Sequence, residues 1–182
     1  MLYIMRHGRT DWNVRHKLQG RTDIPLNDEG RMMAAEAGKK YADIHFDECY
    51  SSPLARAKET AEIFLKGRGV PVYTDDRLVE MGFGIYEGIE NSFAIDDCPI
   101  NVLFKKPEDY VTVEGGESFE ELFARTGKFI DNVVMPQVNS GKDILIVGHG
   151  AMNCSIIAKF RGTSLDKFWD GMTANCQVVK LI

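Results

Sequence analysis

Two arginines and two histidines are the side chains of this sequence best suited to chemistry on an anion. Arg6 and His7 lie at the end of a short apolar run at the start of the chain, and His149 ends a second such run. Arg56 falls in the first turn of the helix predicted over 53–67, which follows the strand-like segment 47–51. A guanidinium is always charged, and its rigid fork of donors matches the oxygens of a phosphate group. If these four side chains converge, they predict a phosphate-binding site.

His7 is the candidate nucleophile of such a site. A neutral imidazole can attack phosphorus when a hydrogen bond to the backbone fixes one ring nitrogen and leaves the other free. Two nearby arginines disfavour the charged imidazolium and keep His7 nucleophilic near neutral pH. His149 can donate a hydrogen bond to a phosphate oxygen and stabilise the charge of the transition state.

Glu80 is the candidate proton donor for the leaving group. It follows a strand-like run and precedes a glycine-rich turn, which can direct its side chain toward the phosphate. A carboxyl group beside a phosphate dianion holds its proton more tightly, as a general acid requires. Glu87 is the second choice. Taken singly, each of these residues has a simpler interpretation, because a lone histidine is more often structural and a surface charge is usually only solvated.

The chain alternates strand-like and helix-like segments, which predicts where these residues meet. Five short runs have the composition of strands: 2–6, 47–51, 70–74, 143–149 and 176–182. Four segments between them are predicted as helices: 27–43, 53–67, 118–138 and 151–162. This alternation predicts an α/β fold of three layers, α/β/α, with a mostly parallel central sheet. Ligands gather at the carboxyl ends of such strands.

Local residue patterns predict where two helices begin and where a long insertion lies. Asn27 is the predicted N-cap of its helix, and Ser118 with Glu121 forms a predicted capping box. We expect residues 1–182 to form one domain. Within it, the segment 85–116 mixes Gly, Pro, Asn and Asp with scattered aromatics, and it is predicted as a small cap or lid over the carboxyl edge of the sheet.

The composition disfavours several function classes. The chain has 182 residues, of which 44% are hydrophobic and 27% charged, and its net charge is −5 at pH 7. These values are typical of a globular protein and disfavour broad binding to nucleic acid or to a membrane. The sequence shows no membrane helix and no secretory leader, so we expect a cytoplasmic location. Its four cysteines are widely spaced, which predicts reduced structural residues and no metal site.

The segments that carry these residues resemble the histidine phosphatase superfamily, also called the phosphoglycerate-mutase-like family, and within it the small phosphatases. The resemblance covers nearly the whole chain. It rests on six motifs: MRHGRTDWN, LQGRTDIPLNDEG, SSPLARAKETA, LVEMGFGIYEG, GGES and VGHG. It implies a phosphoglycerate-mutase-like fold and a phosphatase that acts on a small phosphorylated substrate through a phosphohistidine.

The resemblance also implies roles for individual residues. His7 is implied to be the phosphorylated nucleophile and Glu80 the general acid. The implied phosphate pocket consists of Arg6, Arg56 and His149. Three further residues are implied to contact the substrate: Asn13, Gly20 and Gly150. No metal and no other cofactor is implied, because the arginines neutralise the phosphate charge as Mg²⁺ does elsewhere.

The sequence departs from the family near the expected pocket mouth. The family commonly has Glu at the position of Arg9, Arg at those of Lys17 and Cys154, Asp at Gly82 and Trp at Tyr86. None of these changes removes a residue to which we give a catalytic role. Five basic residues either form a rim for a second anionic group of the substrate or are simply solvated: Arg9, Arg15, His16, Lys17 and Arg21.

Three alternative functions stand beside a phosphatase. A phosphoglycerate-type phosphomutase must keep its phosphohistidine dry, but the mutases of the family carry longer insertions than 85–116, which favours a phosphatase. A phospho-ligand binder without catalysis would lack His7 or Glu80, and both are present. A metal-dependent hydrolase would need a carboxylate cluster that the sequence lacks.

The predicted substrate is a sugar phosphate, a nucleotide-derived phosphate or a phosphorylated acid, and the predicted oligomeric state is a monomer or a homodimer.

Overall fold

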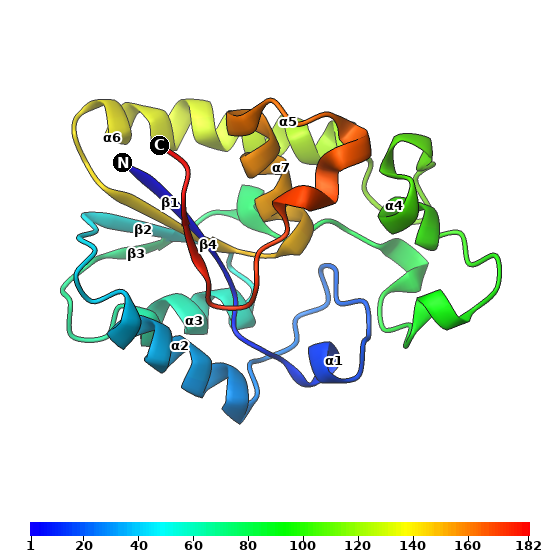
Figure 1. Cartoon of the computed structure of the whole chain (residues 1–182), viewed down its shortest axis with the longest axis horizontal. Helices are drawn as coiled ribbons and strands as arrows, with labels where there is room; N and C mark the ends of the chain where they lie inside the picture. Colours follow the sequence, from blue (N-terminus) through cyan, green and yellow to red (C-terminus); the bar gives the residue numbers. More distant parts are fainter.

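A five-stranded sheet forms the centre of the computed structural model, which describes residues 1–182 (Figure 1). The order of the strands across the sheet is β3-β2-β4-β1-β5. Their bounds are β1 (Leu2–Arg6), β2 (Glu48–Ser51), β3 (Val72–Thr74), β4 (Ile144–Gly148) and β5 (Val178–Lys180). All neighbouring pairs are parallel except β1 with β5, which is antiparallel. The mostly parallel sheet predicted from the sequence is confirmed.

Helices cover both faces of the sheet, so the predicted three layers are confirmed (Figure 1). One face carries α2 (Asp28–Lys40) and α3 (Ala55–Phe64). The other carries α5 (Phe119–Phe129), α6 (Met135–Asn139) and α7 (Gly150–Arg161). None of the helices has both the length and the hydrophobicity needed to cross a lipid bilayer.

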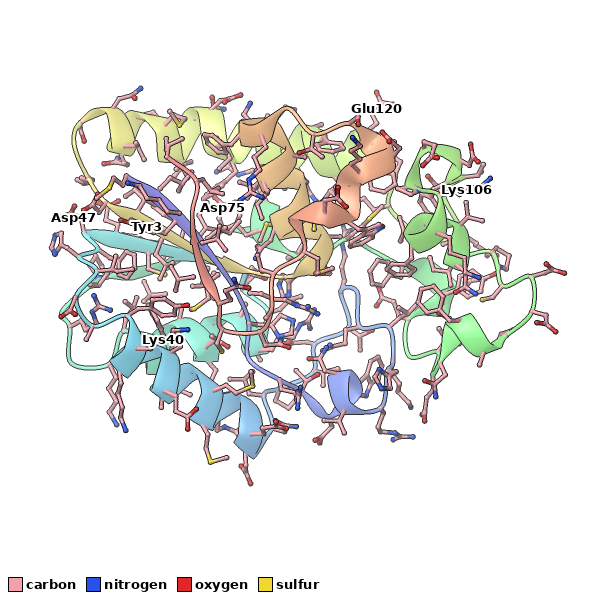
Figure 2. All side chains as sticks on the ribbon, viewed as in Figure 1. Tyr3, Lys40, Asp47, Asp75, Lys106 and Glu120 are labelled. Atoms are coloured by element: carbon pink, nitrogen blue, oxygen red, sulfur yellow. The ribbon has the colours of Figure 1, made fainter.

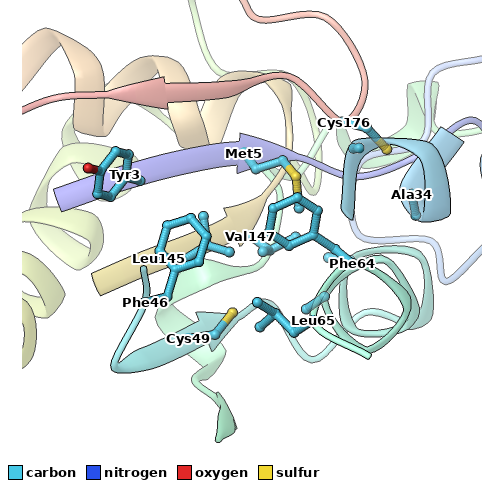
Figure 3. Packing of buried hydrophobic residues seen from close by; sticks show 13 residues of the cluster. Tyr3, Met5, Ala34, Phe46, Cys49, Phe64, Leu65, Leu145, Val147 and Cys176 are labelled. Carbon is cyan, nitrogen blue, oxygen red and sulfur yellow. The ribbon is translucent and has the colours of Figure 1, made fainter. Parts of the chain in front are cut away.

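Alternating side chains of the central strands supply the cores on the two faces of the sheet. Tyr3 and Met5 belong to the cluster under α2 and α3, whereas Leu2 and Ile4 belong to the cluster under α5 and α7. Figure 3 shows the first cluster, in which the ring of Phe46 packs edge-on against Tyr3 with centroids 5.3 Å apart. Successive residues of a strand face opposite sides, so a strand covered on both sides must be apolar throughout. This is why 2–6 reads as a continuous apolar run.

The predicted helix ends at Asn27 and Ser118 are confirmed, but the long helix 118–138 is not continuous. Asn27 accepts a hydrogen bond from the N–H of Gly30, and Ser118 forms a complete capping box with Glu121. Between α5 and α6 the chain makes a π-helical turn over Ile130–Val134. Pro136 explains the interruption, since proline lacks the N–H of a regular helical bond and its ring clashes with the carbonyl four residues earlier.

The segment 85–116 consists of short turns around one small helix. It contains or overlaps α4 (Asn101–Lys105) and three 3₁₀ turns at Gly84–Tyr86, Ser92–Ala94 and Pro107–Asp109. Its buried Ile100 and Leu103 belong to a third hydrophobic cluster that also includes residues of α5, α7 and the 3₁₀ segment Leu165–Gly171. Figure 2 shows Lys106 of this segment at the opposite end of the molecule from Asp47. The insertion therefore extends the molecule beyond one end of the sheet.

Candidate active site

The register of β1 and β4 places the two predicted histidines side by side. Arg6 pairs with Gly148 across the parallel ladder, so His7 and His149 leave the sheet at the same edge. The N–H of His7 donates to the carbonyl of Gly148 at 2.9 Å, and the centroids of the two imidazole rings lie 5.2 Å apart. The expected meeting of strand ends is therefore observed.

His7 is held with one ring nitrogen free. Its Nδ1 lies 2.6 Å from the carbonyl oxygen of Gly8, and because a carbonyl only accepts, Nδ1 carries the proton and donates. Burial, followed by the charges of Arg56 and Arg6, lowers the pKa of His7 well below its usual value, against the smaller opposing effect of the Gly8 hydrogen bond. The imidazole is therefore neutral at physiological pH, and Nε2 has its lone pair available.

Two buried guanidinium groups flank this ring. Arg56 sits in the first turn of α3, where Nη1 donates to the carbonyl of Thr22 at 2.8 Å and Nη2 donates to that of Gly20 at 2.7 Å. Burial lowers the pKa of Arg56 to about 10, so the group stays charged at neutral pH. Arg6 donates through Nη1 to the carbonyl of Thr173 at 3.3 Å. The Nε atoms of both arginines are buried without a partner in the protein.

His149 adds two more unpartnered nitrogens. It is the N-cap residue of α7 and is completely buried, and neither of its ring nitrogens has a hydrogen-bond partner in the protein. Burial, then the charge of Arg56, lowers the pKa of His149 well below its usual value. A buried polar atom without a partner costs free energy and is rare in folded proteins. The orphaned nitrogens of Arg6, Arg56 and His149 therefore indicate a binding site for a ligand rich in acceptors.

The carboxylate of Glu80 lies against the first turn of α7. Its Oε1 accepts hydrogen bonds from the N–H groups of Met81 at 2.8 Å and Met152 at 2.9 Å, and its Oε2 accepts from that of Ala151 at 3.2 Å. The N-terminus of a helix attracts negative charge, so this is a favourable position for a carboxylate. The three bonds bring Glu80 to the same edge of the sheet as the histidines, although it is far from both in sequence.

A cavity of about 120 Å³ opens at this edge. Seven of the eight predicted site residues line it: Arg6, His7, Asn13, Gly20, Arg56, Glu80 and Gly150. His149 does not line the cavity itself, but its ring is tilted by 59° against that of the lining residue His7 at the centroid distance given above. No set of three or more His, Cys, Asp or Glu side chains in the structure is arranged to hold a metal ion.

Several lining residues escaped the sequence analysis. Gln19 is buried at the wall, and its Oε1 accepts a hydrogen bond from the hydroxyl of Thr10 at 2.9 Å, whereas its amide nitrogen has no hydrogen-bond partner in the protein. Its place in the LQG motif directly before Gly20 was an available signal. Trp169 and Met172 enter from the 3₁₀ segment near the end of the chain, and no local pattern marks them.

Glu87, the second choice for the acid, has a structural position instead. Its Oε1 accepts from the N–H groups of Arg21 at 3.0 Å and Phe83 at 3.1 Å, and its Oε2 accepts from both the N–H and the hydroxyl of Thr22. These bonds tie the start of the insertion to the loop after Gly20. Gly20 has φ +54, and a Cβ there would overlap the Glu87 carboxylate, so only glycine fits.

The structure separates the five basic residues of the predicted rim. Three of them are bound in ion pairs: Arg9 to Glu29 at 2.6 Å, Arg15 to Glu90 at 2.9 Å and Arg21 to Glu117 at 2.9 Å. His16 is exposed and does not line the cavity. Lys17 does line it, and its Nζ lies 3.8 Å from the Glu90 carboxylate that Arg15 already binds. Lys17 is therefore the one residue of the five that faces the cavity.

The chain is similar to known proteins over nearly its whole length. The model of the histidine phosphatase superfamily (branch 1) matches residues 2–182. An uncharacterized phosphatase of Bacillus subtilis (strain 168), PhoE, is 35% identical over 159 residues, which are 87% of this chain and 76% of that protein. A 2,3-bisphosphoglycerate-dependent phosphoglycerate mutase of Cytophaga hutchinsonii is 30% identical over 153 residues, 82% of this chain and 72% of that protein. The structure of Bacillus stearothermophilus YhfR superposes with a TM-score of 0.87 at 33% identity, over 97% of this chain and 88% of that one.

Proposed function

The chain belongs to the histidine phosphatase superfamily, and we propose that it is a metal-independent phosphomonoester hydrolase that acts on a small phosphorylated metabolite. One observation carries the proposal. The Nδ1–H of buried His7 donates to Gly8, which leaves Nε2 free at a cavity where Arg6 and Arg56 present positive charge. A neutral nucleophile surrounded by fixed cations is suited to attack on a phosphate dianion.

In the first step, the lone pair of His7 Nε2 forms a bond to phosphorus while the bond from phosphorus to the ester oxygen breaks. The leaving oxygen takes a proton from the Glu80 carboxyl group, so the alcohol departs neutral. Arg6, Arg56 and His149 donate hydrogen bonds to the equatorial oxygens, where negative charge is greatest in the transition state. Their fixed positions cost no reorganisation during the reaction.

In the second step, water attacks the phosphorus of phosphorylated His7. The bond from phosphorus to nitrogen breaks, and the Glu80 carboxylate takes a proton from the water. Inorganic phosphate leaves, and both His7 and Glu80 return to their starting forms. Asn13, Gln19, Gly20 and Gly150 lie on the wall of the cavity, where they would contact the phosphate or the group attached to it.

Release of phosphate from a panel of small phosphomonoesters in excess EDTA tests the proposal. We expect the native protein to release phosphate and His7→Ala to release none above background. After rapid quenching at alkaline pH, which preserves phosphohistidine, the native protein should also carry acid-labile phosphate. Release that depends on added metal, or equal release by His7→Ala, would contradict the proposal.

A phosphomutase is the second candidate, because a phosphoglycerate mutase is among the relatives. A mutase returns the phosphoryl group from the histidine to a bound acceptor instead of to water. The insertion 85–116 holds only turns and the five-residue α4, which favours access of water. Incubation with a phosphoglycerate separates the two: a mutase interconverts the isomers, whereas a phosphatase releases inorganic phosphate.

A further inference from the structure

We propose that a buried ion pair outside the cavity, Glu117 with Arg125, positions Glu80 for proton transfer. This inference rests on the proposed function, in which Glu80 is the general acid. Neither residue of the pair lines the catalytic cavity, so both are positioning residues that act through the backbone around Glu80. The evidence is the set of atoms to which their donors and acceptors are bound.

The segment that carries Glu80 has no regular secondary structure to hold it. A 3₁₀ turn ends at Leu78, and residues 79–82 belong to no helix or strand. The general acid of the proposed reaction therefore sits on a stretch of irregular chain. Proton transfer requires heavy atoms within hydrogen-bond distance, about 2.6–3.2 Å, so this stretch must be fixed by other contacts.

Arg125 supplies contacts on the side that precedes Glu80. It lies on α5, and its Nη1 donates to the carbonyl of Arg77 at 2.7 Å and to that of Val79 at 2.8 Å. Its Nε and Nη2 donate to Glu117 at 2.6 and 2.9 Å. One guanidinium group thus joins helix α5, the chain entering Glu80 and the Glu117 carboxylate.

Glu117 supplies contacts on the side that follows Glu80. Its backbone N–H donates to the carbonyl of Gly82 at 2.9 Å, and its Oε2 accepts from the N–H of Gly82 at 3.4 Å. Arg21 completes the unit, because its Nη2 lies 2.9 Å from Glu117 Oε1 and its Nε donates to the carbonyl of Glu80 at 3.4 Å. Backbone atoms on both sides of Glu80, and its own carbonyl, are therefore held by one charge network.

The pair at the centre of the network, Glu117 with Arg125, is largely buried. The Glu117 side chain is 4% exposed and that of Arg125 is 15% exposed. A buried ion pair contributes little net stability compared with apolar residues of the same volume, but it fixes geometry when all of its donors and acceptors are paired. The observed bonds of this pair join its two members to each other, to Arg21 and to the backbone that flanks Glu80 on both sides. Positioning of the Glu80 segment is therefore the effect that the geometry supports.

The dependence of the reaction rate on the leaving group tests this inference. A general acid matters for an alkyl phosphate, whose leaving alkoxide needs a proton, and matters much less for p-nitrophenyl phosphate, whose leaving phenolate is stable. kcat/KM reports only the steps up to departure of the alcohol, so it excludes the later hydrolysis of the phosphohistidine. Loss of the acid in Glu80→Gln should therefore lower kcat/KM for an alkyl ester by about 10²-fold or more, and lower kcat/KM for the aryl ester far less. Glu80→Gln serves as the reference.

The test variant is Arg125→Met, which removes both carbonyl contacts and keeps an unbranched apolar stem. We expect kcat/KM for the alkyl ester to fall about 10-fold to 100-fold relative to kcat/KM for the aryl ester. The double variant Glu117→Gln/Arg125→Met leaves no buried carboxylate without its main partner, so it covers the case in which the single variant does not fold. Arg125→Lys should restore part of the ratio, because an ammonium can still reach one carbonyl.

Arg77→Met is the matched control. It removes a neighbouring arginine whose guanidinium pairs with Asp75 and does not contact the Glu80 segment through its side chain. Its alkyl-to-aryl ratio should stay native. If the Arg125 variants lose both activities by the same factor, the pair is merely structural and the inference is overturned. If Glu80→Gln itself shows no dependence on the leaving group, the proposed acid role of Glu80 fails instead.

Discussion

Two parts of the chain meet at the catalytic cavity but are built differently. One is the edge of the sheet at the ends of β1 and β4, and the other is the insertion 85–116, which contributes Phe104 to the cavity wall. Arg6 and His7 continue a buried strand, and the ladder to β4 fixes their backbone on both sides. The insertion has no strand, and Asn91 and Asp97 there adopt positive φ. It also exposes large apolar side chains, with Phe93 58% exposed and Val111 82% exposed. From this difference we expect the rigid sheet edge to carry out the proposed chemistry, and the insertion to select the group attached to the phosphate.

This division makes a general prediction for substitutions. A change at the sheet edge should lower kcat for every phosphomonoester by a similar factor. A change in the wall formed by the insertion, or in the residues that face it, should alter the ranking of esters and leave the chemical step intact. The four changes below test this distinction.

Arg56→Lys should have the largest effect. Arg56 is 1% exposed, and its guanidinium already donates to two backbone carbonyls. These bonds fix the direction in which its remaining N–H groups can donate to a phosphate. A lysine ammonium cannot reproduce that fork, and we expect kcat/KM to fall by about 10²-fold to 10³-fold for all esters alike. Steady-state kinetics on an alkyl and an aryl ester measure both factors. A loss for only one ester would contradict the assignment of Arg56 to the phosphate.

Acidification should destabilise the folded protein through the two buried histidines of the sheet edge. His7 and His149 are buried with pKa values lowered well below normal, so the unfolded chain takes up their protons near pH 6.5 while the folded chain does not. Since the unfolded state then binds more protons, the free energy of unfolding falls as pH drops below about 6.5, by at most about 1.4 kcal/mol per pH unit for each histidine.

Urea unfolding at pH 7.5, 6.5 and 5.5 measures this slope. His149→Gln should flatten it, because one of the two buried imidazoles is gone. The insertion 85–116 has no histidine, so Phe93→Ala serves as the control and should keep the native slope. Equal stability of the native protein at pH 7.5 and 5.5 would show that the two rings are protonated in the fold.

Lys17→Gln should change selectivity more than rate. Lys17 faces the cavity, and the Glu90 carboxylate beside it also binds Arg15. The backbones of Lys17 and Glu90 form an isolated β-bridge, which connects Lys17 to the insertion. We expect an ester with a second anionic group to lose about tenfold in kcat/KM relative to an otherwise matched neutral one, which is the effect of one charged hydrogen bond. A phosphoglycerate and glycerol phosphate form such a pair, since they differ only in a carboxylate and a hydroxymethyl group.

Arg15→Gln is the comparison variant for Lys17. It removes the other cation bound to Glu90, but Arg15 does not line the cavity. Its preference between the two esters should stay native. If Lys17→Gln also keeps the native preference, the basic residues near the mouth are solvated surface charges and the idea of a second anionic group is wrong.

Much of the sheet edge was predictable from the sequence, because it depends on local signals. The apolar run before Arg6, the run before His149 and the cap at Asn27 each determine an element without reference to distant residues. Their meeting then follows from the topology of a parallel sheet. The hydrogen bonds of Glu80 to the first turn of α7 join residues about 70 positions apart, and no local pattern specifies them.

The same reason explains what the sequence analysis missed. Arg125 contacts the Glu80 segment from α5, and Trp169 reaches the cavity from the end of the chain, so both depend on how helices dock. The break in the long helix is different. Pro136 is visible in the sequence within 118–138, so the loss of regular helical hydrogen bonds around it could have been predicted.

Phe93→Ala should have the smallest effect of the four and is the most direct test of the insertion. The ring of Phe93 is more than half exposed, packs against Phe104 with centroids 5.6 Å apart, and lines a groove that shares Asn13 and Lys17 with the catalytic cavity. Its loss removes apolar surface from the far side of the site, where an ester with a large alcohol would extend. We expect KM to rise about threefold to tenfold for an ester with a bulky apolar alcohol and to stay native for a short one, with kcat unchanged for both. A fall in kcat for the short ester would show that the insertion takes part in the chemical step, and the division between the two walls would then fail.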